Sequence, residues 1–126
     1  MASATISVII PLYNKEREIG VTLRSVLAQT LPPAEIVVVD DGSTDRSAEI
    51  VRGIRSPLVK LVTQPNAGEC AARNRAIAES TGDYIALLDA DDTWEPGFLE
   101  EIAAMIAEFP GCGVYSTAFN IVSHDG

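Results

Sequence analysis

The chain has 126 residues, of which 47% are hydrophobic, and its 18 acidic residues against nine basic ones give a net charge of −9. A chain of this length and composition folds as a globular domain, which excludes a disordered or low-complexity segment. The acidity argues against nucleic acid as a partner, because a nucleic-acid-binding face needs clustered Lys and Arg. No apolar run reaches the roughly 18 residues that cross a bilayer, and we expect no signal peptide.

Short apolar runs rich in Val, Ile and Leu recur along the chain and predict four strands. They cover residues 6–11, 35–40, 58–63 and 83–89. Three of the runs are nearly continuous in hydrophobicity, which is typical of strands that are buried on both faces of a parallel sheet.

Segments of helical period separate these runs. The first keeps one apolar face over residues 19–27, and Asn14 is its expected N-cap. The second is expected to take Ser43 or Thr44 as its cap and to carry Asp45 in its first turn, where an acidic side chain suits the helix dipole.

The later elements follow the same alternation. A third helix is predicted over residues 68–80, with Gly82 at its C-terminal stop, and a fourth is predicted from Pro96 to Pro110. A last extended stretch is expected over residues 112–122. The pattern predicts one α/β domain over residues 1–126, with a doubly wound, mostly parallel, Rossmann-like sheet that carries helices on both faces.

The two cysteines, Cys70 and Cys112, stand far apart and form no C-x-x-C pair. This usage is typical of a reducing compartment, so we expect two buried free thiols and a cytoplasmic protein. A membrane-peripheral position of a longer parent protein is the open alternative.

Polar residues gather where three of the predicted strands end. The clusters are Pro11, Tyr13 and Asn14 after the first strand, residues 40–43 after the second, and Asp89, Asp91 and Asp92 after the fourth. Because parallel strands end at one edge of their sheet, these clusters should lie on a common rim, which is where open parallel sheets bind ligands. The segment 66–75 opens the third helix from the same rim.

The acidic residues of this rim point to a divalent cation. Like charges crowded at one edge repel one another unless a cation compensates them or their pKa values rise. The D-A-D spacing of Asp89 and Asp91 can direct two carboxylates to one oxygen-coordinated Mg²⁺ or Mn²⁺, which then bridges to a diphosphate. The alternative is that these Asp residues only make turns and cap helices.

Other rim residues suit a nucleotide. Tyr13 can stack on a nucleobase, or instead pack against the first helix. Asp41 can accept a hydrogen bond from an imide N–H, which uracil offers and cytosine does not. Arg73 or Arg75 can reach a phosphate, or lie on a solvated helix face. Trp94 is expected to pack on the fourth helix rather than contact a ligand.

Four segments of the chain resemble the family 2 glycosyltransferases. They are SVIIPLYN (7–14), VVVDDGSTD (37–45), NAGECAARNRAI (66–77) and ALLDADD (86–92). The resemblance covers essentially the whole chain. It implies a GT-A fold and an inverting enzyme that uses a nucleotide-diphosphate sugar, with a uridine nucleotide favoured.

The resemblance also implies a role for the matching residues in nucleotide binding. Tyr13 is similar to the aromatic residue that stacks on uracil, with Pro11 beside it. Asp41 resembles the residue that binds the base, and Asp40 would support it. Gly68 and Arg73 resemble the stretch that runs past the nucleotide and its phosphates.

For the metal, the resemblance implies that Asp89 and Asp91 form the D-x-D site, which also serves the ribose, and that Asp92 extends it. The metal would be Mn²⁺ or Mg²⁺. The implied reaction is a single in-line displacement onto the hydroxyl of a saccharide, lipid or protein acceptor, as in polysaccharide biosynthesis.

The general base of such a reaction is not identifiable in the sequence, because the acidic residues after Asp92 fit a helix or lie at the chain end. We therefore expect the donor-binding half of a truncated catalytic domain. The alternative is a non-catalytic nucleotide-binding or interaction module. Self-association through exposed apolar surface is also expected. A catalytic role for His124 has no support from its neighbours.

Overall fold

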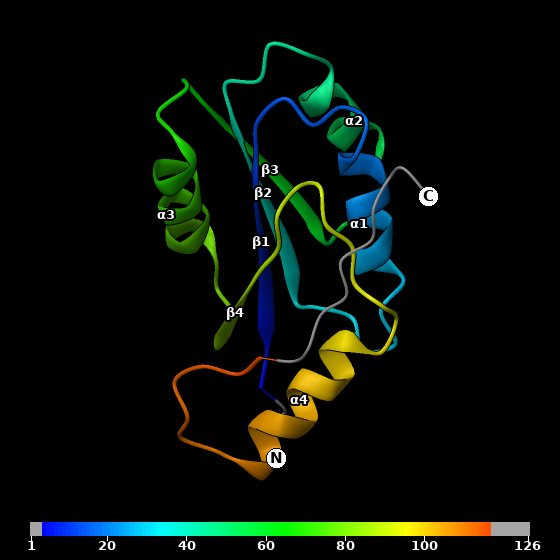
Figure 1. Ribbon diagram of the computed structural model, residues 1–126, viewed down its shortest axis with the longest axis vertical. Coiled ribbons are helices and arrows are strands. Elements are labelled where there is room, and N and C mark those ends of the chain that lie inside the picture. Colours follow the sequence, from blue (N-terminus) through cyan, green and yellow to red (C-terminus); the bar gives the residue numbers. More distant parts are fainter. Residues whose placement is uncertain (1–3, 117–126) are drawn as a thin grey trace, which may run out of the picture.

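The structure is a computed structural model that describes residues 4–116. Strands and helices alternate along these residues (Figure 1). The strands are β1 (Ile6–Leu12), β2 (Glu35–Asp41), β3 (Val59–Gln64) and β4 (Tyr84–Leu87), and the helices are α1 (Ile19–Leu27), α2 (Ser47–Gly53), α3 (Glu69–Glu79) and α4 (Phe98–Glu108). The four strands predicted between residues 6 and 89 and the four predicted helices are present, with ends that move by a few residues.

The strands form one parallel sheet in the order β3-β2-β1-β4. The chain moves outward from β1 to β3 and then crosses back to the other side of β1, so the strand order reverses between β1 and β4. Helices α1 and α2 cover one face and α3 covers the other (Figure 1). The doubly wound parallel sheet with helices on both faces is therefore confirmed.

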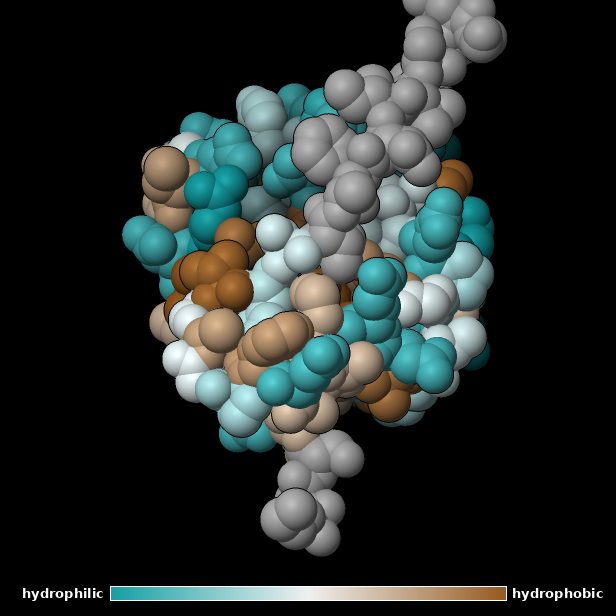
Figure 2. All heavy atoms as spheres, turned by 60° about the horizontal axis from the view of Figure 1, so that its bottom comes forward, coloured by the Kyte–Doolittle hydropathy of each residue, from teal (hydrophilic) through white to brown (hydrophobic). Residues whose placement is uncertain are grey.

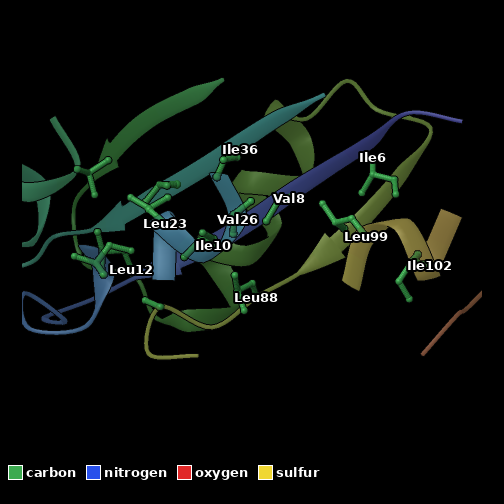
Figure 3. Close-up of a cluster of buried hydrophobic side chains, with 14 of the residues drawn as sticks. Ile6, Val8, Ile10, Leu12, Leu23, Val26, Ile36, Leu88, Leu99 and Ile102 are labelled. Carbon is green, nitrogen blue, oxygen red and sulfur yellow. The ribbon is translucent and has the colours of Figure 1, made fainter. Parts of the chain in front are cut away.

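Alternate side chains of β1 supply two separate cores, one on each face of the sheet. On the face of α1, α2 and α4, the larger cluster includes Val8, Ile10, Leu12, Leu23, Val26, Ile36 and Leu99 (Figure 3). On the face of α3, Ile9 packs with Val37, Val39, Ala72 and Ala76. Each fully buried Ile or Leu contributes about 2 kcal/mol of transfer free energy.

The two central strands of the sheet, β1 and β2, are held firmly. Strands β1 and β2 are almost wholly buried, and the register pairs Leu12 with Asp40 at their carboxyl ends. The edge strands β3 and β4 contain only half-buried and exposed residues. The central strands therefore fix where their rim loops start.

The predicted caps of the first two helices are wrong. Helix α1 begins at Ile19 with Glu18 at its N-cap position, and α2 begins at Ser47 with Arg46 there, and neither cap residue makes a side-chain hydrogen bond. Asp45 also lies before α2 rather than in its first turn. Asn14 and Ser43 instead accept hydrogen bonds from backbone N–H groups of the facing loop, as described below, and Asp45 Oδ1 accepts from the N–H of Ser47, the first residue of α2, at 2.9 Å.

Gly82 and Pro96 also differ from expectation. Helix α3 ends at Glu79, and Gly82 instead lies against β1, where an added Cβ would come within 2.6 Å of the hydroxyl oxygen of Ser7. Gly82 is therefore required for close packing and does not stop the helix. Helix α4 begins at Phe98, two residues after Pro96.

The last expected strand is not seen in the part of 112–122 that the structure describes. Residues 112–116 are irregular, and residues 117–122 lie outside the described range, as does His124. Both thiols are free, but Cys70 and Cys112 are exposed, so the expectation that they are buried is wrong. Cys70 faces outward because the buried face of α3 is set by Ala72 and Ala76.

Within residues 4–116, no helix has the length and apolar character needed to cross a membrane. Trp94 stacks on Phe98 of α4, with ring centroids 4.5 Å apart, which confirms its packing role.

Candidate functional site

A cleft of about 450 Å³ opens at the carboxyl ends of the strands, on the rim where the strand order reverses. Six predicted site residues line this cleft: Pro11, Tyr13, Asp41, Gly68, Asp89 and Asp91. They come from loops after three different strands and from the start of α3. The topology therefore brings together residues that are far apart in the sequence.

Three predicted site residues lie beside the cleft rather than in its lining. Asp40 is buried, and its Oδ1 accepts a hydrogen bond from the Ser43 backbone N–H at 3.2 Å. Arg73 is half-buried on α3 and pairs with Glu69, which lines the cleft, at 2.8 Å. Asp92 belongs to the acidic cluster described below.

Tyr13 lies just beyond the carboxyl end of β1, and 46% of its surface is exposed. It belongs to neither of the two buried clusters found within residues 4–116. Pro11, two residues earlier, is half-buried in the same wall of the cleft. The position of Tyr13 therefore favours a ring that meets a ligand over one that packs against α1.

Asp41 is a buried carboxylate that fastens the loop between β3 and α3. Its Oδ1 accepts hydrogen bonds from Gln64 Nε2 at 2.9 Å and from the Ala67 N–H at 2.8 Å. Its Oδ2 accepts from the Gly68 N–H at 3.0 Å and from Asn66 Nδ2 at 3.3 Å. Burial raises the pKa of Asp41, but the hydrogen bonds from Gln64, Ala67 and Gly68 outweigh it and hold this pKa below its ordinary value.

Gly42 brings the same two loops into direct contact. Its φ of +73° lies in the left-handed region, and an added Cβ would stand 2.7 Å from the backbone nitrogen of Asn66. Only glycine fits both conditions without strain. Asp41 and Gly42 thus hold the loop between β3 and α3 in place in addition to forming the turn after β2.

Asn14 joins the loop after β1 to the loop after β2. Its backbone has a φ of +48°, which Asn tolerates better than most residues. Its N–H donates to Ser43 Oγ at 2.9 Å, and its Oδ1 accepts from the Thr44 N–H at 2.8 Å. The backbone N–H of Glu16 donates to Asp45 Oδ2 at 3.1 Å. These bonds hold the loops that border the cleft in one arrangement.

Asp89, Asp91 and Asp92 form an exposed cluster after β4, in which one carboxylate oxygen from each residue lies within 4.8 Å of the others. Burial, and then the charges of Asp91 and Asp89, raise the pKa of Asp92 above its ordinary value. Carboxylate oxygens that converge in this way are the donors that hard divalent cations prefer, so the residues present fit Mg²⁺ or Mn²⁺.

Lys15 is a cleft residue that sequence reasoning missed. It lines the cleft, and its Nζ lies 3.6 Å from Asp91 Oδ2, which joins the loop after β1 to the acidic cluster after β4. Asn66 and Glu69 line the cleft as well. The signal in the sequence was the position of Lys15, two residues after Tyr13 on the rim, but a single lysine there has no distinctive pattern.

Known proteins are similar to this chain in sequence. A family model described as glycosyl transferase family 2 matches residues 7–123. The uncharacterized glycosyltransferase YibD of Escherichia coli strain K12 is 43% identical over 105 residues, which are 82% of this chain and 30% of that protein. Glycosyltransferase GlyA of Streptococcus pneumoniae serotype 4 is 39% identical over 106 residues, which are 82% of this chain and 15% of GlyA.

A solved structure is similar as well. The crystal structure of S. aureus TarS 1-349 in complex with UDP-GlcNAc is 33% identical, with a TM-score of 0.75, and the match covers 89% of this chain and 37% of that one. This likeness confirms the Rossmann-like GT-A architecture expected from the sequence. The chain spans a third or less of the length of the two curated relatives.

Proposed function

Since this chain belongs to glycosyl transferase family 2, we propose that its cleft binds the nucleotide diphosphate of a sugar donor, with UDP as the favoured nucleotide. The observation that carries the proposal is that an exposed aromatic ring, Tyr13, and two carboxylates of the acidic cluster, Asp89 and Asp91, line one cleft at the strand-order reversal. The complex of TarS with UDP-GlcNAc supports this choice of ligand.

We assign the base to the wall after β1 and β2, and the ribose to Asp89 at the start of the D-x-D segment. Tyr13 stacks on the nucleobase, and Pro11 forms the adjoining surface. Asp41 shapes this wall by holding residues 64–68 in place, and Asp40 supports it by fixing the turn at Ser43. Within residues 4–116, four groups of the chain itself already donate hydrogen bonds to the carboxylate of Asp41. A direct hydrogen bond from the base to this carboxylate therefore stays a prediction.

We assign the diphosphate to the wall after β4. Asp89, Asp91 and Asp92 are the residues that would hold a divalent cation, and such a cation neutralises the charge that develops on the departing diphosphate. Gly68 leaves the start of α3 open to the phosphates, since nothing would crowd a Cβ there within 4 Å. Arg73 reaches a phosphate only when it leaves Glu69.

The curated relatives are longer than this chain, and for a protein of their kind that carries this domain we propose transfer of the sugar to an acceptor hydroxyl with inversion at the anomeric carbon. The chain's own part is to bind and orient the donor so that the leaving diphosphate faces the carboxylate wall. No residue among 4–116 is assigned as the general base. Donor binding is therefore the activity to test on this chain first.

The test is calorimetric titration of UDP into the purified chain with Mn²⁺ and then with EDTA. We expect binding that requires Mn²⁺ and is lost in Asp91→Ala. Glu101→Ala is the matched control, because it removes the same charge from the exposed side of α4, away from the cleft. Binding that is equal with EDTA would contradict the metal assignment, and absence of binding under every condition would contradict the proposed function.

Release of UDP from a UDP-sugar, measured on the natural gene product that carries this domain, separates an enzyme from a non-catalytic module. An enzyme releases UDP at a rate that rises with a saccharide acceptor, and Asp91→Ala abolishes this rise. A module binds UDP equally well but releases none from the sugar nucleotide.

A further inference from the structure

The charges that line the cleft are unbalanced, and this imbalance bears on a diphosphate. Within the described residues, four acidic side chains line the cleft and Lys15 is the single cationic one. The guanidinium of Arg73 lies outside this lining and pairs with Glu69. A diphosphate is itself strongly negative, so its entry needs a positive group that faces it. Lys15 is the only residue of the lining that can supply one.

The backbone of Lys15 is fixed while its side chain is free to turn. Its N–H donates to Ser47 Oγ at 2.9 Å, and its carbonyl accepts from the N–H groups of Glu18 at 3.1 Å and Ile19 at 2.9 Å. These bonds hold its Cα at the start of α1. The side chain is 41% exposed, so its four-carbon stem can swing between neighbouring partners.

The contact between Lys15 and Asp91 is weak enough to exchange. The two charged atoms are 3.6 Å apart, and both side chains are nearly half exposed. Ion pairs of this kind contribute little, because water and salt screen them. Asp91 is also one of the carboxylates that fit a divalent cation, and an ammonium group and such a cation repel each other at one carboxylate.

We infer that Lys15 serves the donor as a movable cation, which pairs with Asp91 in the structure and turns to the diphosphate when Asp91 holds a divalent cation. The inference rests on the proposed nucleotide-sugar site and adds a residue to it. Before the donor binds, Lys15 competes with the divalent cation for the carboxylate of Asp91. After the donor binds, Lys15 contacts the diphosphate. It therefore links metal binding to nucleotide binding.

The experiment measures two affinities in the same proteins. Mn²⁺ alone is titrated and followed by electron paramagnetic resonance, and UDP is titrated by calorimetry at saturating Mn²⁺. The variants are Lys15→Met, which keeps the apolar stem, and Lys15→Arg, which keeps the charge. Lys60→Met is the control, because Lys60 pairs with Glu79 at 3.0 Å and does not line the cleft.

For Lys15→Met we expect Mn²⁺ affinity to rise about threefold, since a competing ammonium group is gone. We expect UDP affinity to fall by about tenfold, the size of a lost hydrogen bond between charged groups. Lys15→Arg keeps most of the UDP affinity, and Lys60→Met changes neither affinity. A misfolded variant would lose both affinities together, so the opposite directions are specific to the inferred role.

Unchanged UDP affinity in Lys15→Met, or a parallel loss of both affinities in a variant that keeps the melting temperature of the unmodified chain, would overturn the inference while leaving the proposed function in place. If the unmodified chain binds Mn²⁺ but no UDP, the proposed function fails and the phosphate contact fails with it. The Mn²⁺ titration then still decides whether Lys15 competes for Asp91. If the unmodified chain binds neither, both are overturned.

Discussion

At the scale of single residues, Asp41 stands out because its buried carboxylate accepts hydrogen bonds from a single segment of the chain. It is 3% exposed, and its four donors belong to residues 64–68. Two of the donors are backbone N–H groups just before α3, which no helical carbonyl can satisfy. The charge of Asp41 therefore stabilises the loop and the start of the helix together.

We expect Asp41→Asn to lower the free energy of unfolding by about 2 kcal/mol at pH 7, because an amide turns donors toward donors at a buried site. The folded pKa of Asp41 lies below its unfolded value, so its contribution is complete above an unfolded pKa of about 3.9 and is lost as the pH falls through the folded pKa. The difference in stability between the two proteins should therefore begin to shrink below about pH 4 and should disappear only below the folded pKa.

Urea unfolding of both proteins between pH 7 and pH 3 measures this difference directly. All other titrating groups are shared, so they cancel in the comparison. A difference that keeps the same size down to pH 3 would show that the charge of Asp41 is not what stabilises the loop.

At the scale of elements, the rim loops work as a connected set. Asn14 joins the loops after β1 and β2, and Gly42 and Asp41 join the loops after β2 and β3. The strands supply the positions from which these loops start, and the loops supply each other's hydrogen bonds. A substitution in one loop should therefore change the conformation of the neighbouring loop.

Gly42→Ala tests this coupling. We expect it to cost about 2 kcal/mol of unfolding free energy, because alanine is strained at a φ of +73° and its Cβ would meet the backbone of Asn66. Gly53→Ala is the control, since no atom lies within 4 Å of its Cβ position and alanine suits α2 better than glycine.

Thermal unfolding and UDP titration of both glycine variants provide the check. Gly42→Ala should lower both the melting temperature and the affinity for UDP, whereas Gly53→Ala should leave both unchanged or slightly raise stability. Equal behaviour of the two variants would argue that the loops are independent.

The strands could be predicted from the sequence because burial on both faces leaves a continuous apolar run, as in β1 and β2. The helix caps could not be predicted in the same way. Asn14 and Ser43 carry the side chains that cap helices, but their partners are brought close only by the folded rim. Gly82 likewise is required because it packs against Ser7, which lies 75 residues earlier in the chain.

In the candidate site too, some features could be predicted from the sequence and others depend on contacts made only in the folded chain. Parallel topology alone predicts that Tyr13, Asp41 and Asp89 share a rim, and they line one cleft. The hydrogen bonds of Asp41 and the ion pair of Lys15 depend on side-chain distances that no sequence pattern records. Local patterns therefore located the site, and its internal contacts came only from the structure.

At the scale of the whole molecule, one side of the sheet is incompletely covered. Strand β4 is an edge strand that pairs with β1 alone within residues 4–116, and its Ile85 and Leu87 are 40% and 58% exposed. Ile77 on α3 is 40% exposed as well. In Figure 2, apolar residues gather on the side where Figure 1 places α3, β4 and the loop after α4.

A free apolar strand edge favours pairing with a second copy of the chain, and the net charge of −9 opposes it by repulsion between copies. Salt screens that repulsion over a Debye length of about 10 Å at 0.1 M but leaves the apolar contact intact. We therefore expect self-association that increases with protein concentration and with NaCl. Sedimentation equilibrium at several salt concentrations measures it.

Leu87→Lys should abolish this association, because it places a charge in the contact beside the free edge of β4. Val21→Lys is the matched control: Val21 is 54% exposed, but it lies on α1 on the opposite face of the sheet. If both variants associate like the unmodified chain, the contact lies elsewhere on the surface. A single monomeric species at every concentration and salt level would show that charge repulsion outweighs the apolar edge.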